Sequence, residues 1–472
     1  MKGAAHAAIA LVAAVACAAA GLAQETAAGR LPAPITLEQA VAYALAHHPA
    51  LRASAAVEER AGAQLDLARS RFLPYGDIGL QENRGTGNVV PGTHFTMAGI
   101  PPISGPPRDR VFDSGDWGST AGLSLWWDVA HLSQKIALAD AALAQRAGAR
   151  AAADAQLLEV AYGAADAFAA LVAAGQQVEA ARASVRRARV FQTTVDALVR
   201  SGLRPGADGA RAAAETALAQ TEQIRAEQAQ RLDEAYLAQA LGAAGEQVAV
   251  VPGRLLQEVR GAPPPSRISP RNPLIIGAVD AARAAHDRAH AARLEFIPRV
   301  EIVAALFGRA NGLFPGGANL AFAQGLVPDT PNWGAGLVLT IPILQYPEIR
   351  ARADAAAADA KLALARRDQV VQQVRTQIDA ARAIVDSAYK IAAQARVSQD
   401  SSRAALAQAQ ARYQAGLYGI DPVAEALRLL ARAEADNAVA CVDIWRARLL
   451  AARAAGDLGP LMAEVSAAGG GR

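Results

Sequence analysis

Histidine pairs are the first places in this 472-residue chain where metal-dependent chemistry could occur. His286 and His290 have the i, i+4 spacing with which two imidazoles bind one zinc ion from a single helix face. Two charged residues follow His286, however, and the glutamate of a zinc-protease helix is missing. His47 and His48 precede a proline and have no partner at metal-ligand spacing. Solvated helix faces explain the pattern better, so the sequence predicts no metal site.

Residues for nucleophilic or phosphate chemistry do not occur in recognisable patterns either. The chain has no nucleophile elbow, no Gly-rich phosphate loop and no paired Cys-x-x-Cys. Its two cysteines, Cys17 and Cys441, are too few for a disulfide framework. The net charge of +3, without basic blocks, argues against nucleic acid as a partner. We therefore expect a protein that is not an enzyme and that binds neither a cofactor nor nucleic acid.

The elements that carry these residues form a repeat. Gly122 to Leu203 and Gly336 to Leu417 correspond without a gap (336 − 122 = 214 and 417 − 203 = 214). A constant offset over such a length indicates one structural unit used twice. Upstream, Pro49 corresponds to Pro273 at a different offset (273 − 49 = 224). The first repeat therefore carries extra residues before Gly122, which places a loop of variable length there.

Each repeat contains one very long helix. In the second copy, apolar and small side chains recur every three or four residues from Val371 to Tyr413, and the pattern recurs from Leu157 to Val199 in the first. Such a heptad seam is typical of helices that pack lengthwise on partners. About 65 helical residues would form a rod on the order of 100 Å. Aromatic residues make up only 5% of the chain, too few for a conventional globular core, and alanine-rich helices resolve that mismatch.

Four other segments alternate with a period of two, with apolar side chains on one face and small or polar ones on the other. They predict strands at about 75–82, 117–127, 298–307 and 333–341. Strands of this kind suit a transmembrane β-barrel whose apolar face meets lipid. Four strands cannot close a barrel, and an open edge cannot sit in lipid. The chain must therefore form at least a dimer, and the strands alone leave eight, twelve or more open.

The first residues indicate export. Residues 1–23 have a lysine, an apolar run and Gly21-Leu22-Ala23 before Gln24, which is typical of a secretory signal peptide with a small-x-small cleavage site. Cys17 follows Ala14-Val15-Ala16, which resembles a lipoprotein box without its usual leucine, so lipidation at Cys17 is an alternative. We expect an exported protein without a helical membrane anchor.

The mature chain divides at its Gly- and Pro-rich segments. We expect repeat 1 at 24–245 with a helical hairpin tip near 201–206, a linker at 246–268, repeat 2 at 269–456 with a tip near 415–420, and a disordered tail at 457–472. Gly202-Leu203 and Gly416-Leu417 lie at the two tips, where glycine is suited to end a helix before the chain turns back. The fold class is mainly α, with a membrane β-barrel portion.

This arrangement resembles the TolC family of bacterial outer-membrane efflux and secretion channels. Leu37–Leu51 (LEQAVAYALAHHPAL) is similar to that family's opening L-x-x-A-x-x-x-A-L-x-x-N-P-x-L, with His48 in place of asparagine. Arg71-Phe72-Leu73-Pro74, Asn272-Pro273, Gly336-Leu337 with Ile341-Pro342 and the two Gly-Leu tips also match in order. No single motif is specific, but the doubled set covers essentially the whole mature chain. One departure is Asp128, which stands where the second copy has Pro342.

The resemblance implies a homotrimer in outer-membrane lipid, with a twelve-stranded barrel and a periplasmic helical tunnel. The tips, Gly202, Leu203, Gly416 and Leu417, would meet a periplasmic adaptor (membrane fusion) protein and an inner-membrane pump or ABC exporter. The family's entrance matches a further set of positions in this chain, which are Asp208, Tyr413, Asp421 and Glu425. The implied function is the passive exit duct of a tripartite efflux pump or type I secretion system.

Two other interpretations remain open from the sequence. The carboxylates of Asp208, Asp421 and Glu425 are also what a helix start favours, because they complement its dipole; this role is compatible with an acidic ring that selects cations. A periplasmic coiled-coil adaptor or a structural protein of an export machine would also contain long helical hairpins. An adaptor would flank its hairpin with Gly-rich β modules, and a structural protein would not need the four strands.

Overall fold

The computed structural model describes residues 34–85, 116–257, 259, 268–311 and 325–466. The expected signal peptide with Cys17, most of both loops between paired strands and the second half of the linker lie outside the described residues. The chain divides into two compact units. Unit 1 comprises Met1–Ala55, Ala152–Leu274 and Val371–Arg472, and unit 2 comprises Ala56–Ala151 and Ile275–Val370.

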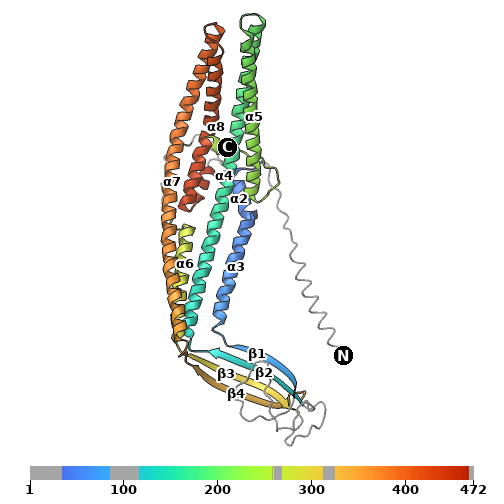
Figure 1. Cartoon of the computed structure of the whole chain (residues 1–472), viewed down its shortest axis with the longest axis vertical. Coiled ribbons are helices and arrows are strands. Elements are labelled where there is room, and N and C mark those ends of the chain that lie inside the picture. The colour runs from blue at the N-terminus through green and yellow to red at the C-terminus, as the bar shows by residue number, and fades with distance from the viewer. Residues whose placement is uncertain (1–33, 86–115, 258, 260–267, 312–324, 467–472) are drawn as a thin grey trace, which may run out of the picture. The chain divides into compact units, whose positions relative to one another are not determined.

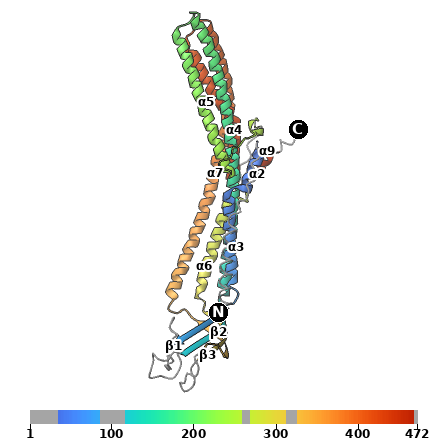
Figure 2. The same cartoon turned by 90° about the vertical axis from the view of Figure 1, so that its right-hand side faces the viewer.

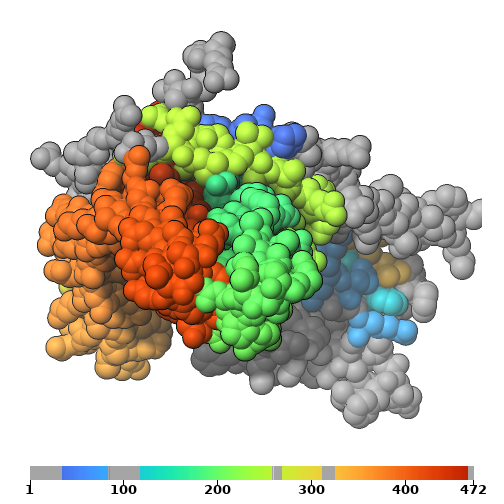
Figure 3. Space-filling view, turned by 90° about the horizontal axis from the view of Figure 1, so that it is seen from above, coloured from blue at the N-terminus to red at the C-terminus, as the bar shows by residue number. Residues whose placement is uncertain are grey.

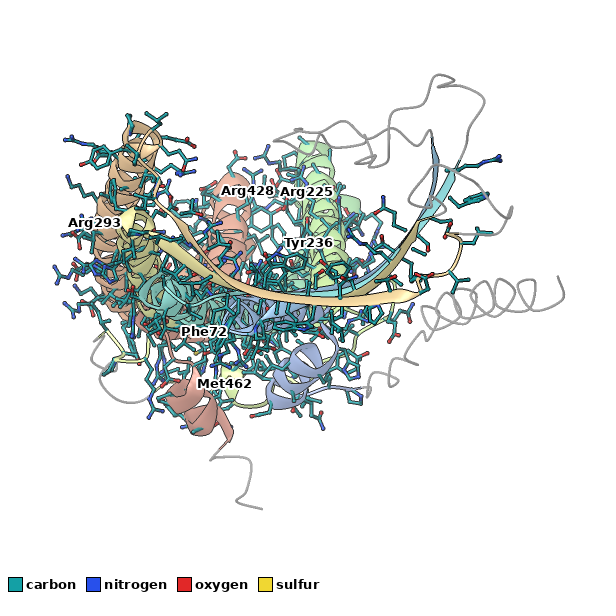
Figure 4. The ribbon with its side chains drawn as sticks, turned by 90° about the horizontal axis from the view of Figure 1, so that it is seen from below. Phe72, Arg225, Tyr236, Arg293, Arg428 and Met462 are labelled. Carbon is teal, nitrogen blue, oxygen red and sulfur yellow. The ribbon has the colours of Figure 1, made fainter. Side chains whose placement is uncertain are left out.

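Unit 2 contains one antiparallel sheet in which the strands follow chain order (Figure 1). Its strands are β1 (Tyr75–Gly85), β2 (Asp116–Asp128), β3 (Arg299–Asn311) and β4 (Thr330–Thr340). Seen from below, the sheet is curved (Figure 4). Strands form at all four predicted places. On the loop side, β1 and β4 extend three residues and β3 four residues beyond the expected bounds, because pairing continues into the segments that lead to the loops, whereas β2 is only one residue longer at each end.

The register places most of the large apolar side chains of the four strands on one face of the sheet. Leu123 lies opposite both Ile78 and Leu306, and Leu306 lies opposite Trp333. We call this the apolar face; Ile78, Leu80 and Trp333 on it are each at least 80% exposed. The other, polar face carries mainly small and polar residues, which include Asp77, Gly79, Gly122, Ser124, Gly334 and Gly336. It also carries Tyr75, Trp126, Val303, Phe307 and Val338. A sheet that leaves so many large apolar groups uncovered needs an apolar environment or a partner.

The helices of unit 2 lead into and out of the sheet. They are α6 (Pro273–Arg293), most of α3 (Pro49–Ser70), and the first parts of α4 (Leu132–Arg200) and α7 (Tyr346–Gln414). The α4 and α6 backbones approach closely where each has a glycine, since a Cβ on Gly277 would lie 3.6 Å from Ala151 Cβ and one on Gly148 3.8 Å from Gly277 O. At the start of α4, the buried His131 holds the turn after β2, with Nδ1 3.2 Å from Asp128 Oδ2 and Nε2 2.8 Å from Ile297 O.

Unit 1 contains two long helical hairpins and a group of short elements packed against them (Figures 1 and 2). The hairpins pair α4 with α5 (Gly206–Leu241) and α7 with α8 (Asp421–Ala455). The short elements are α2 (Leu37–His47), the 3-10 turn Gly253–Leu256 and α9 (Gly459–Ser466). The α2 helix begins with a capping box, in which Thr36 and Gln39 bond each other's backbone N–H groups at 3.3 and 3.0 Å.

The predicted heptad seams are the faces that the long helices bury. In α7, the residues from Val374 to Tyr413 that follow the seam are buried or half-buried, while most of their neighbours are exposed. In α4 the seam is buried in the same way from Val160 to Val195, and only its first member, Leu157, is exposed, at 42%. Among the described helices, α4 alone contains an 18-residue window apolar enough to cross a membrane, and half of that window is buried. It therefore has the character of a packed helix.

The end of the chain corrects one expectation. The sequence predicts disorder at 457–472, but Gly459–Ser466 form α9, and 467–472 lie outside the described residues. Leu458, Leu461 and Val465 are buried in the same core as Phe168 and Trp445. The tail is therefore held by the burial of three apolar side chains, a pattern too short to be distinguished from background in the sequence. The first half of the expected linker is also packed, because Ile35 pairs with Val250 and Leu255 is buried.

The two repeats begin α3 and α6 in the same way with different side chains. Asn272 is 2% exposed; its Oδ1 accepts a hydrogen bond from Leu274 N at 3.1 Å, and its Nδ2 donates to Ala455 O at 3.3 Å, at the end of α8. In the first repeat His48 stands at this place, and its Nδ1 accepts from Ala50 N at 3.2 Å. A histidine therefore reproduces the helix-starting bond of asparagine.

Candidate gate at the hairpin tips

Both hairpin tips turn at glycine. Gly202 and Gly416 adopt φ values of 75° and 76°, which favour glycine because a side chain is strained there. After each, a leucine N–H bonds back to the helix end: Leu203 N to Leu198 O at 2.9 Å and Leu417 N to Arg412 O at 3.0 Å. This is the Schellman geometry, so the expectation that both glycines terminate helices is confirmed. The two leucines are each 71% exposed.

The structure brings two of the four predicted entrance residues together. The Tyr413 hydroxyl, near the end of α7, donates to Asp208 Oδ2 at 2.9 Å, in the first turn of α5. Tyr413 is 1% exposed and meets Phe191 edge to face, with ring centroids 5.8 Å apart. Burial is the largest cause that raises the pKa of Tyr413 to about 12, and the hydrogen bond to Asp208 and the negative charge of Asp208 add to it. The phenol therefore stays protonated and keeps donating at every physiological pH.

Arg204 completes this contact from the first tip. Its guanidinium lies 4.2 Å from the centre of the Tyr413 ring and donates to the Tyr413 backbone carbonyl, which is one of the last carbonyls of α7. A cation over an aromatic face and a donor to a helix end are both favourable. Arg204 and Asp208 thus hold Tyr413 from two sides. We call Arg204, Asp208 and Tyr413 the tip latch.

The other two predicted residues lie on the exposed surface of α8. The side chain of Asp421 is 84% exposed, and its Oδ1 is 3.9 Å from Arg211 Nε. Glu425, one turn further, is exposed too. The pKa of Arg428 is raised chiefly by its hydrogen bonds to another carboxylate, Glu215, and by that charge, and the charge of Glu425 adds to this effect. Asp208 and Asp421 both lie in the first turn of a helix, as the dipole interpretation expects.

An ion pair with a buried carboxylate lies further along the two hairpins, and sequence reasoning missed it. Glu215 in α5 is 6% exposed; its Oε2 and Oε1 accept from Arg428 Nε and Nη2 at 3.0 and 2.5 Å, and Arg211 Nε is 3.4 Å away. Further along the hairpins, Arg187 of α4 bonds Glu434 of α8. The i, i+4 spacing of Arg211 and Glu215 was readable in the sequence. The partners from the other hairpin were not, because their pairing depends on the register between helices.

Alongside this ion pair, α4, α5 and α8 line a groove of about 660 Å³. The view onto the hairpin ends shows α4 and α5 beside α7 and α8 (Figure 3). Arg225 of α5 and Arg428 of α8, which are labelled in Figure 4, both line the groove, and alanines form much of its wall. The tips therefore combine exposed turns, a cross-hairpin latch and a groove with an ion pair at its edge.

The chain has an open sheet that exposes an apolar face and two long helical hairpins that meet at capped tips. This is the fold of a membrane-channel subunit. The chain matches the model of the outer membrane efflux protein family over residues 40–243 and 265–450, and it belongs to that family. The family comprises channel proteins rather than enzymes, and its members act in the bacterial outer membrane. The chain is therefore an outer-membrane efflux channel protein with a periplasmic helical part.

Solved structures show the same fold at low sequence identity. A membrane protein from Pseudomonas aeruginosa is 21% identical, with a TM-score of 0.74 over 89% of this chain and 90% of that one. The CmeC outer membrane channel of Campylobacter jejuni is 17% identical, with a TM-score of 0.74 over 91% and 89%. The outer membrane protein VceC of Vibrio cholerae is 18% identical, with a TM-score of 0.73 over 89% and 96%. No curated protein sequence matches the chain.

Proposed function

We propose that three copies of this chain close a twelve-stranded barrel and a helical tunnel, which together form a passive exit duct from the periplasm. The observation that carries this proposal is the sheet. Within the described residues, β1 and β4 are edge strands with one neighbour each, while the apolar face spans all four strands. Open edges cannot face lipid because their N–H and C=O groups would lack partners. Pairing β4 of one copy with β1 of the next satisfies both edges.

The tip latch supports a closed gate at the periplasmic entrance. Arg204 and Asp208 belong to the first hairpin and Tyr413 to the second, so their bonds hold the two hairpins together. Asp421 and Glu425 carry exposed charge on α8 beside these tips. Three copies around an axis would repeat these carboxylates as a ring that attracts cations. Separation of the hairpins, with loss of the latch, would open the duct.

The exposed turns at the tips support docking of a periplasmic adaptor, which would join the channel to an inner-membrane pump or ABC exporter. Leu203 and Leu417 present apolar side chains at the two tips. Gly202 and Gly416 fix the turns that present them. The duct would serve a tripartite efflux pump or a type I secretion system, with its energy supplied by the partner.

Particle symmetry and conductance test the proposal. The mature protein, purified in detergent, should give threefold end views in negative-stain electron microscopy. It should also form cation-selective pores after insertion into planar bilayers. Monomeric or two-chain particles that produce no conductance would contradict barrel closure. Threefold particles with anion-selective pores would contradict the acidic entrance while leaving the barrel intact.

A further inference from the structure

The polar face of the sheet carries an aromatic pair among its mainly small and polar side chains. Tyr75 of β1 and Trp126 of β2 lie directly opposite each other in register on this face. Their rings stack, with centroids 5.4 Å apart and an interplanar angle of 14°. Tyr75 is 59% exposed and Trp126 is half-buried. An exposed, nearly parallel aromatic pair does not fill a core here, so packing within the chain does not account for it.

The neighbours of this pair leave space around it. In the same row across the sheet, Trp126 is followed by Val303 and then by Gly336. The next row contains Asp77 opposite Ser124, followed by Ala305 and Gly334. On this side, the aromatic surface is therefore bordered by small side chains. We call Tyr75, Trp126 and Asp77 the aromatic shelf.

Carboxylates lie on both sides of the aromatic row. Asp77 is two residues from Tyr75 on the same face and is exposed. On the other side, Asp128 is two residues from Trp126 and opposite Glu301. Asp128 is engaged by His131, whereas Asp77 is exposed to solvent. At about 3.4 Å per residue, each carboxylate row is roughly 7 Å from the aromatic row.

We infer that the aromatic shelf is a binding site for planar aromatic cations inside the barrel. The inference rests on the proposed function, because the apolar face must meet lipid for the polar face to line the lumen. A flat cation would stack on the exposed rings, gain the attraction of the ring faces for positive charge, and lie near Asp77. Three copies would place three shelves around one lumen. The site would slow such solutes during passage and favour them over anions of the same shape.

Current block in planar bilayers tests the site, with proflavine as the planar cation. Pyrenesulfonate is the planar anion and tetramethylammonium the non-aromatic cation. Proflavine should interrupt the current with resolved dwell times, while the other two should not. The double variant Tyr75→Leu/Trp126→Leu should shorten proflavine dwell times about fivefold or more, because stacking on one aromatic ring alone supports a change of that size. Asp77→Asn should shorten them about threefold through the lost charge.

A matched control is Trp127→Leu, which removes an indole from the opposite face of the same strand and should leave dwell times unchanged.

Open-pore conductance in the same recordings separates the proposed duct from the proposed aromatic shelf. Absence of a pore contradicts the duct itself. A pore with equal proflavine dwell times in wild type, the double variant and Asp77→Asn overturns the shelf alone. If the double variant does not insert, Asp77→Asn still decides, because it keeps both rings.

Discussion

Substitution of Tyr413 by phenylalanine should weaken the closed state of the channel without changing its core. The variant keeps the ring against Phe191 and under Arg204 but loses the hydroxyl that donates to Asp208 at 2.9 Å. A hydrogen bond to a charged group contributes about 1.5–3 kcal/mol. Asp208 is only half-buried, so water can replace part of the bond, and the lower end of this range applies.

Three copies multiply the effect if the gate opens as a unit. About 1.5 kcal/mol per copy sums to about 4–5 kcal/mol, which changes the ratio of open to closed channels on the order of a thousandfold. The assay is the resting conductance of purified channels in planar bilayers, without any adaptor. Tyr418→Phe is the matched control. Tyr418 also lies at a tip and pairs with Arg412, at 3.1 Å, but it is 45% exposed and does not touch the latch.

The pH dependence gives a second signature of the same residue. The pKa of Tyr413 is raised from its ordinary 10.0 to about 12. Because the folded value lies above the unfolded one, the contribution of the neutral phenol is fully present below pH 10 and is lost as pH rises towards 12. Resting conductance should therefore increase between pH 10 and 12 in the wild type but not in Tyr413→Phe. Equal resting conductance of both proteins at neutral pH, with both trimeric, would refute the latch.

Three further predictions concern the rest of unit 1. Glu464→Gln should release α9, because it leaves the buried Arg448 without its counter-charge. Allowing for the partial exposure of Glu464, the substitution should lower the stability of the packed α9 by about 1–2 kcal/mol. Protease cleavage of the tail measures this release. Arg448 lowers the pKa of Glu464, so wild-type α9 should also detach as pH falls below about 4.5, the ordinary value. His48→Asn should add the carbonyl bond that Asn272 makes and stabilise the protein by about 1 kcal/mol, seen as a higher melting temperature. Leu203→Glu should abolish adaptor binding in a pull-down while resting conductance is unchanged, and retained binding would exclude this tip as the contact.

The long-range pattern of the sequence predicted the architecture because it repeats and because its periods are sustained. The seam from Val371 to Tyr413 corresponds to the buried face of α7, and the alternation around Leu123 corresponds to one face of the sheet. Over many turns, small local exceptions cannot change such a period. The short helix α9 has too few turns to establish one, and so it was missed although its three apolar residues are buried.

The candidate site was predictable only in part, for a different reason. Tyr413 and Asp208 were found through the family resemblance, and the structure places them in contact. Their arginine partner, Arg204, and the pair Glu215–Arg428 depend on how two hairpins align. Registers between separate helices leave no periodic trace in a single chain, because any of several arginines in α8 could have reached a glutamate in α5.

The contacts between the hairpins share a property that bears on how the gate works. The latch, the pair Glu215–Arg428 and the pair Arg187–Glu434 all join the first hairpin to the second within one chain. Each copy can therefore form its closed tip before it meets another copy. In the proposed trimer, assembly would then bring three closed tips together at the entrance, and opening would require each chain to break its own contacts. Amide exchange at the tips of a chain that cannot trimerise should consequently be as slow as in the assembled channel, and fast exchange there would show that the closed tip is made by neighbouring copies instead.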